Sequence, residues 1–243
     1  MLKLPIFNPL GDRAVLMDFE NAGEGGAENI AKIAALITRR KLVGVIDVVP
    51  AFSRISIHYD PALIAGDRKH SPHDRIVTDL QKLLNEKNRS ALLVESREFR
   101  IPVCYDTKFG LDLTDLAKSR DLSVGELIDM HCAPSYVVGA IGFAPGFPYL
   151  EGINPKLIFP RRANPRVRVP AGSVALAASY TGIYPSALPG GWHIIGRTNK
   201  RLFSFEENGG ALLRVGDRVR FNCISREEFD DTNQSDRKAS EKQ

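Results

Sequence analysis

Four arginines stand within eight residues of a segment, 160–173, that three prolines stiffen. They are Arg161, Arg162, Arg166 and Arg168, with Pro160, Pro165 and Pro170 around them. Side chains two residues apart in a strand point to the same face, so we expect Arg166 and Arg168 to face the same way. Guanidinium groups bind carboxylates and phosphates through paired hydrogen bonds. The segment therefore predicts a site for an anionic substrate or nucleotide. A solvated or partner-facing surface is the alternative.

Two more segments combine glycine, proline and aromatic residues. The residues that could line a site are Phe143, Pro145, Gly146, Phe147 and Tyr149 in the first, and Thr181, Tyr184, Gly190, Gly191, Trp192 and Arg197 in the second, with Gly172 and Ser173 following the arginines. Glycine lets a backbone approach a ligand, and the rings would form an apolar wall. We expect the three segments to share one hollow. Barrel corners plugged by rings are the alternative.

His131 is a candidate general base at the end of an amphipathic segment, Ser123–Cys132. In this segment Ser123 and Glu126 have capping-box spacing, which predicts a helix. A buried core histidine is the alternative interpretation. Cys132 has no visible activating partner and is expected to be an inert thiol.

The N-terminal part predicts alternating strands and helices. The expected strands are Ala14–Phe19, Val43–Val49 (interrupted by Pro50) and Arg54–Tyr59, and the expected helices are Ala27–Arg40 and His73–Asn88. This β-α-β-β-α order predicts a small α+β, ferredoxin-like domain over residues 1–94. The polar stretch 85–98 marks its boundary.

The following part predicts a mainly-β barrel over residues 95–229. Short strands separated by glycine and proline favour a barrel over a helical domain. The expected strands are Arg100–Tyr105, Tyr136–Phe143, Arg166–Pro170, Ser173–Ala178, Gly191–Gly196, Leu212–Val215 and Asp217–Cys223, with helices at Asp112–Arg120 and Ser123–Cys132. Residues 230–243 are polar and predict a disordered tail.

Composition excludes several classes of function. A net charge of +4, spread along 243 residues, is too small to indicate nucleic-acid binding. Cys104, Cys132 and Cys223 lie far apart, which argues against disulfides and a metal site and favours a reducing cytoplasm. Neither a signal peptide nor a membrane span is expected. The sequence contains no phosphate-loop, dinucleotide, nucleophile-elbow or HExxH motif.

The three segments resemble the KipI or allophanate hydrolase subunit 1 family, which includes the B-type subunit of bacterial 5-oxoprolinase. The matching runs are 142–150, the Pro-Arg-x-x-x-Pro-Arg-x-x-Val-Pro-Ala-Gly-Ser-Val run from Pro160, 181–185, 189–192 and 195–198, with weaker matches at 11–14, 59–61 and 216–221. The resemblance covers nearly the whole chain. It implies a small α+β domain followed by a cyclophilin-like barrel.

The resemblance also implies an activity that needs partners. Family members act with an allophanate hydrolase subunit 2 or KipA-like protein (the C-type subunit of 5-oxoprolinase) and with an A-type subunit, and convert 5-oxoproline, ATP and water to glutamate, ADP and phosphate. ATP would be shared with these partners, and no metal or prosthetic group is implied in this chain, which is expected to be inactive alone. Motif arginines Arg161, Arg166 and Arg197 would contact carboxylate or phosphate and, with backbone amides, stabilise a phosphorylated intermediate.

Two alternatives to a 5-oxoprolinase subunit remain open at this point. One is an inhibitor of a sensor histidine kinase, and the other is a subunit of a urea carboxyltransferase-type amide hydrolase. The chain departs from the family where Ala178-Ser179-Tyr180 stands in place of the usual Gly-Gly-Gln, and where Leu202-Phe203-Ser204-Phe205 replaces Leu-Phe-Asp-Pro. A different amide-bearing substrate is therefore compatible with the sequence.

Overall fold

The chain folds into two compact units, Met1–Ser96 and Arg97–Gln243. The computed structural model describes residues 4–20, 25–64, 70–85, 96–205 and 210–232. The expected boundary between residues 94 and 95 lies outside these ranges. Among the described residues, no helix is both long and apolar enough to cross a membrane.

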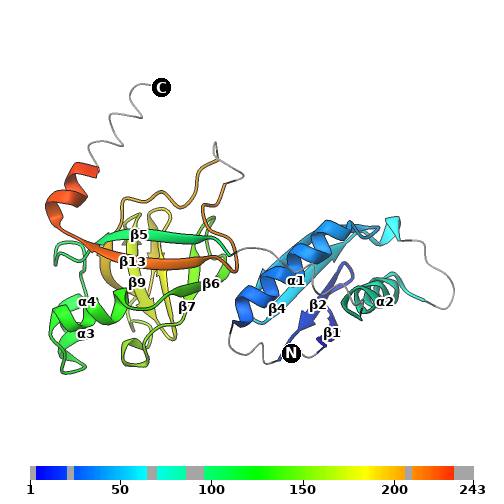
Figure 1. Cartoon of the computed structure of the whole chain (residues 1–243), viewed down its shortest axis with the longest axis horizontal. Helices are drawn as coiled ribbons and strands as arrows, with labels where there is room; N and C mark the ends of the chain where they lie inside the picture. Colours follow the sequence, from blue (N-terminus) through cyan, green and yellow to red (C-terminus); the bar gives the residue numbers. More distant parts are fainter. Residues whose placement is uncertain (1–3, 21–24, 65–69, 86–95, 206–209, 233–243) are drawn as a thin grey trace, which may run out of the picture. The chain divides into compact units, whose positions relative to one another are not determined.

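The first unit is a four-stranded antiparallel sheet packed against two helices (Figure 1). The sheet order is β1-β2-β4-β3, with β1 Ile6–Pro9, β2 Ala14–Asp18, β3 Val45–Ala51 and β4 Arg54–Tyr59, and the helices are α1 Gly26–Arg40 and α2 Pro72–Asn85, with a short 3-10 helix at Pro61–Leu63. The predicted apolar stripe of α1 is buried, as are alternate residues of β4, because one face of each element meets the same core.

The observed sheet differs from the predicted one at both edge strands. Pro50 lies inside β3 and pairs with Ile55 instead of interrupting the strand. Proline is tolerated there because β3 is an edge strand, where a missing backbone N–H disturbs no further neighbour. The opposite edge is β1, a strand that was not predicted.

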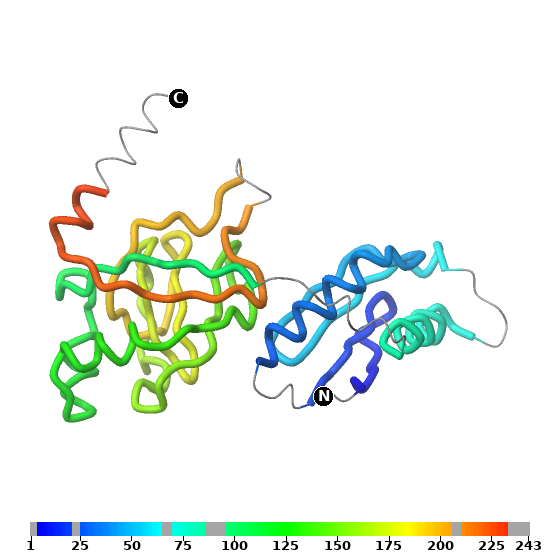
Figure 2. The backbone as a smooth tube through the Cα atoms, in the orientation of Figure 1, coloured from blue at the N-terminus to red at the C-terminus, as the bar shows by residue number. Residues whose placement is uncertain are grey.

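The second unit is a closed barrel of seven strands. Their order is β10-β7-β6-β13-β5-β12-β9, with β5 Glu98–Cys104, β6 Tyr136–Ile141, β7 Pro148–Glu151, β9 Ser173–Ala177, β10 Tyr180–Ile183, β12 His193–Arg197 and β13 Arg218–Ile224. Strand β13 runs parallel to β5 and closes the barrel (Figure 2). Helix α3 (Leu113–Lys118) packs against β12, and helix α4 (Val124–Cys132) packs against β13. The predicted capping box at Ser123 is present at the start of α4. The barrel therefore confirms the mainly-β prediction.

A second, smaller core lies on the outer side of the barrel wall. Along β9, Val174 and Leu176 belong to the inner core, whereas Ala175 and Ala177 belong to this outer one. A two-stranded sheet of β8 (Arg166–Val169) and β11 (Leu188–Gly190) contributes to it through Val169 and Leu188. A further 3-10 helix spans Pro155–Leu157. The outer core thus joins segments in which the sequence predicted a site.

Two predictions near the C-terminus are wrong. The expected strand Leu212–Val215 is irregular and ends in a turn, because the Arg214 N–H donates to the Asp217 side chain. Residues 226–232 form a helix, so the expected disordered tail does not begin at residue 230. Phe229 anchors this helix against Phe109, with the ring centroids 4.7 Å apart. Residues 233–243 lie outside the described residues.

Candidate functional site

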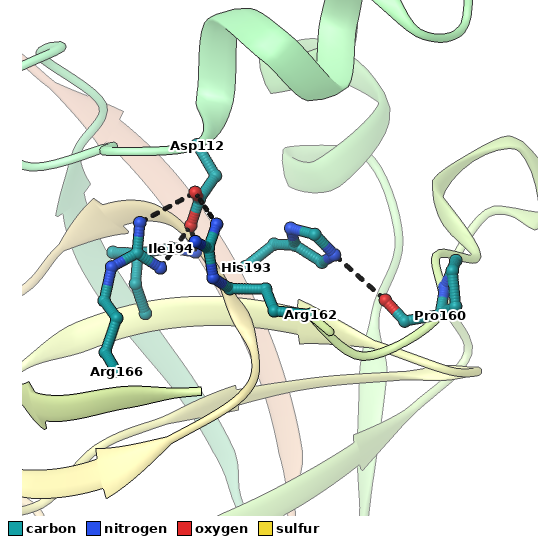
Figure 3. Close-up of polar contacts among 6 residues, drawn as sticks. All are labelled: Asp112, Pro160, Arg162, Arg166, His193 and Ile194. Atoms are coloured by element: carbon teal, nitrogen blue, oxygen red, sulfur yellow. Dashed lines mark hydrogen bonds and ion pairs between the residues drawn. The ribbon is translucent and has the colours of Figure 1, made fainter. Parts of the chain in front are cut away.

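Two of the four clustered arginines are bound to one buried carboxylate, that of Asp112 (Figure 3). Arg166 donates from Nη1 to Oδ2 and from Nη2 to Oδ1, both at 2.8 Å, and Arg162 Nη1 donates to Oδ1 at 2.6 Å. The backbone N–H of Ile194 donates to Oδ2 at 2.7 Å. This arrangement, here called the Asp112 clasp, ties the arginine segment to β12 and to the residue preceding α3.

The clasp keeps the Asp112 carboxylate ionised although it is buried. Burial alone would raise the pKa of Asp112, but hydrogen bonds from Arg166 and Ile194 and the charges of both arginines outweigh it and lower the pKa. The two guanidinium groups share this single negative charge, so the three side chains together carry a net charge of +1. Arg166, predicted as a catalytic arginine, is therefore committed to a structural ion pair in this conformation.

The other clustered arginines are placed differently. Arg161 and Arg168 are exposed, and Arg168 does not share the Asp112 carboxylate that Arg166 binds. Arg161 lies close enough to Tyr184 for its charge to affect the pKa of that phenol, which burial raises overall. The arginine segment is thus anchored at two positions and open to solvent at two others.

Arg197 at the end of β12 is partly buried and stacks on an aromatic ring. Its guanidinium carbon lies 5.0 Å from the ring centroid of the buried Phe109, and burial lowers the pKa of Arg197. Its Nε is buried and has no hydrogen-bond partner, and within the described residues no carboxylate pairs with it. A cation that is stacked on a ring, partly desolvated and lacking a counter-ion is prepared to accept an anion.

Ser173 adds a second unsatisfied group beside Arg197. The two residues are direct cross-strand partners on β9 and β12, so their side chains lie on the same face. Ser173 is fully buried, and its Oγ has no hydrogen-bond partner within the described structure. A buried polar group left unpaired costs about 1–3 kcal/mol. Together Arg197 and Ser173 form the candidate site.

The predicted aromatic residues pack against one another in the outer core. Phe147 contacts Tyr149, Tyr184 and Trp192 with centroid separations of 5.1, 5.2 and 5.4 Å in edge-to-face geometry. Gly190 makes room for Tyr184, because a Cβ at that position would lie 2.1 Å from its hydroxyl oxygen. Gly191 accepts the Arg162 N–H through its carbonyl oxygen. The three segments therefore converge as predicted, but their rings fill the space where they meet.

The loop 142–147 carries the predicted residues that remain at the surface. Phe143 is 62% exposed and adopts a positive φ of 70°, an uncommon conformation for a side chain of this size. Its ring contacts Phe147 at 5.5 Å, Pro145 is exposed, and Gly146 is buried against Phe203. The loop is thus a strained, partly aromatic edge of the outer core, and it does not reach the Arg197 side chain through any contact in the described structure.

His131 lies inside the barrel and not at this site. Its Nε2 lies 2.9 Å from Thr181 Oγ1 and its Nδ1 lies 2.7 Å from the Tyr105 hydroxyl, while its ring stacks on Phe221. Thr181 uses its own proton for the Ala175 carbonyl, so His131 carries its proton on Nε2 and accepts from Tyr105. Burial lowers the pKa of His131 to about 3. The geometry supports a core histidine, and the predicted roles of His131 and Thr181 at a ligand site are not supported.

Two residues that matter here were not predicted. Asp112 is a single carboxylate before a short helix, 54 residues from Arg166, and nothing in the local sequence indicates the pairing. Phe109 lies in a turn between β5 and α3. Because it is far from Arg197 in sequence, the sequence does not indicate that the two side chains stack. Within the described residues, no cluster of His, Cys, Asp or Glu could hold a metal ion.

Comparison with known proteins places the chain among carboxyltransferase-like domains. Residues 5–213 match the family model described as carboxyltransferase domain, subdomain C and D. The B subunit of 5-oxoprolinase from Bacillus subtilis (strain 168) is 39% identical over 227 residues, which cover 90% of this chain and 93% of that protein. The B subunit of 5-oxoprolinase from Escherichia coli O157:H7 is 36% identical, with coverages of 87% and 93%.

A solved structure, that of TTHA0988, agrees with the fold. It superimposes with a TM-score of 0.73 at 35% identity. The match covers 88% of this chain but 40% of the solved chain, which is therefore considerably longer.

Proposed function

Because this chain belongs to the carboxyltransferase domain, subdomain C and D, family, we propose that it acts as the B subunit of an ATP-dependent 5-oxoprolinase. Two relatives that match it over nearly their whole length carry that name. These similarities do not favour the kinase-inhibitor and urea carboxyltransferase alternatives. The reaction would add water across the lactam C–N bond of 5-oxoproline, giving glutamate while ATP is converted to ADP and phosphate.

In this chain, the proposal is supported by Arg197, whose guanidinium group stacks on Phe109 and whose Nε lacks a hydrogen-bond partner among the described residues. 5-Oxoproline carries a carboxylate next to its lactam ring, and a carboxylate would neutralise the Arg197 guanidinium, which stacks on Phe109 and has no acidic partner within the described residues. The unsatisfied hydroxyl of Ser173, on the same face, would donate to a substrate oxygen. Arg166 would then act indirectly, since it is bound in the Asp112 clasp, whereas Arg161 is exposed and could contact the substrate.

The proposal includes partner chains and shared ATP. A KipA-like C-type subunit, together with an A-type subunit, would complete the enzyme, and this chain would be inactive alone. The length of TTHA0988 supports the idea, because most of that chain lies outside the part that matches ours. ATP would bind in the assembly, with phosphorylation of the lactam oxygen preceding hydrolysis.

We also propose the fold type of each unit that the sequence suggested. The β2-α1-β3-β4-α2 order with adjacent β2, β4 and β3 supports a ferredoxin-like first unit, in which β1 lies beside β2 at the edge that the last strand of such a fold occupies. The closed seven-stranded barrel supports a cyclophilin-like second unit.

Co-expression with the two partner subunits tests the function. The purified assembly is expected to form ADP and glutamate in a 5-oxoproline-dependent manner. Arg197→Ala should raise KM for 5-oxoproline roughly 10- to 100-fold, since a charge-assisted hydrogen bond contributes about 1.5–3 kcal/mol. Arg197→Lys should recover part of the loss. Arg168→Ala, at an exposed arginine of β8, is the matched control. Absence of turnover, or equal effects of Arg197→Ala and Arg168→Ala, would refute the proposal.

A further inference from the structure

A hollow on the second unit carries arginines that neither the clasp nor the Arg197 site uses. Its walls come from the start of β5 and from the two segments before β13. The lining residues are Arg97, Phe99, 201–204, 210–212 and Arg214. None of these is acidic. The hollow therefore has a basic lining that includes two aromatic rings, and it contains no residue of the Asp112 clasp or of the Arg197 site.

The walls of the hollow are held in place by backbone hydrogen bonds. Phe203 and Ala211 form a β-bridge, and the Leu212 N–H donates to the Leu202 carbonyl at 2.9 Å. Gly210, at a φ of 102°, lies against the Phe203 ring so closely that a Cβ would come within 2.7 Å of it. The two segments consequently form a fixed hairpin-like scaffold for the side chains they carry.

The three arginines of the hollow differ in their partners. Arg97 is neutralised, because it donates from Nε to Asp217 Oδ1 at 3.0 Å and stacks over Phe99 at 5.0 Å. Arg201 and Arg214 are exposed, and in the part of the chain that the structure describes their guanidinium groups have neither a hydrogen bond nor an ion pair. Two arginines that have no partner among the described residues thus line a hollow whose third arginine is paired with Asp217.

We propose that this hollow binds a phosphoryl group, as carried by inorganic phosphate or by a nucleotide. A phosphoryl group has close to two negative charges at neutral pH and three acceptor oxygens, which match the two guanidinium groups of Arg201 and Arg214. A simple carboxylate would neutralise only one of them. The site goes beyond the proposed function, because it involves neither Arg197 nor the lactam.

Isothermal titration of the whole chain with inorganic phosphate, ADP and acetate tests the site. Saturable binding of phosphate or ADP, at least tenfold tighter than that of acetate, is expected. The double variant Arg201→Gln/Arg214→Gln should weaken it at least tenfold, whereas Arg168→Gln, outside the hollow, should not. Tighter binding of ADP than of phosphate would identify the nucleotide as the source of the phosphoryl group. Absence of saturable binding, or equal binding by the double variant, would overturn the proposal.

Two acidic residues close in sequence to the first lining segment provide an independent test. Glu206 and Glu207 follow the first lining segment. Replacing both with glutamine removes negative charge and should leave phosphate binding unchanged or make it tighter. Weaker binding in this variant would contradict an anionic ligand. Because the measurements need only this chain, their outcome is independent of whether an assembly hydrolyses 5-oxoproline.

Discussion

Arg166 meets Asp112 through two parallel hydrogen bonds, Nη1 to Oδ2 and Nη2 to Oδ1, each 2.8 Å long. This geometry is the strongest form of an arginine–carboxylate pair. It joins β8, in the outer layer, to the chain entering α3. An arginine that the sequence marks as a ligand contact thus holds two layers of the domain together.

The first prediction concerns stability. Asp112→Ala removes the acceptor of Arg162, Arg166 and the Ile194 N–H, and should reduce the free energy of unfolding by about 3–5 kcal/mol, because buried charges lose their partner. Urea denaturation followed by circular dichroism measures the change. Asp115→Ala, at an exposed carboxylate in α3, should change stability by no more than about 0.5 kcal/mol. Equal losses in both variants would show that the clasp is not stabilising.

The second prediction is the pH dependence of the clasp. The pKa of Asp112 is lowered in the folded state, below the value of about 3.9 expected when unfolded. Its contribution to stability is therefore fully present above about pH 4 and is lost as the pH falls through the lower, folded-state pKa. Asp112→Asn should thus differ from the wild type at pH 6 and approach it below pH 3. A difference that stayed constant down to pH 2 would contradict this assignment.

The third prediction uses His131. Its pKa is lowered to about 3 by burial, so between pH 6.5 and 3 the unfolded chain takes up a proton that the folded chain does not. Stability from this histidine is present above pH 6.5 and falls with decreasing pH by up to about 1.4 kcal/mol per unit. His131→Gln should flatten the slope of unfolding free energy between pH 6 and 4. An unchanged slope would indicate that His131 is protonated in the folded chain and would reopen its role as a base.

Much of the fold could be predicted from local patterns. The apolar stripe of α1, the Ser123 capping box and the strand Ser173–Ala177 follow from short-range rules of spacing and appear as expected. The partners of the site residues depend instead on contacts between segments far apart in sequence. The motif arginines looked equivalent, yet tertiary contacts pair Arg166 with Asp112 and leave the Nε of Arg197 without a hydrogen bond among the described residues.

His131 is a second residue whose contacts could not be predicted from the sequence. A histidine at a helix end is compatible with catalysis or with the core, and sequence alone leaves both open. Only the fold brings Tyr105 and Thr181 to its two ring nitrogens. The strand expected at Leu212–Val215 failed for a related reason, because a side chain, that of Asp217, binds the backbone there and turns the chain.

The fourth prediction concerns how Arg197 is held. Gly172 has a φ of 75°, and a Cβ there would lie 2.1 Å from the Thr198 carbonyl oxygen and 3.4 Å from Arg197 Cγ. Gly172→Ala should therefore cost at least about 2 kcal/mol through overpacking and backbone strain. It should also raise KM for 5-oxoproline in the assembled enzyme, because Arg197 must move.

Gly142→Ala is the matched control for Gly172→Ala, since nothing lies within 4 Å of its added Cβ. We expect the control to leave both stability and KM nearly unchanged. If Gly172→Ala lowers stability but leaves KM at the wild-type value, Arg197 can shift without loss of binding, and its fixed position would not be required for holding the substrate carboxylate. If neither variant has an effect, the contact between Gly172 and Thr198 relaxes freely, and β9 and β12 do not hold Arg197 in register.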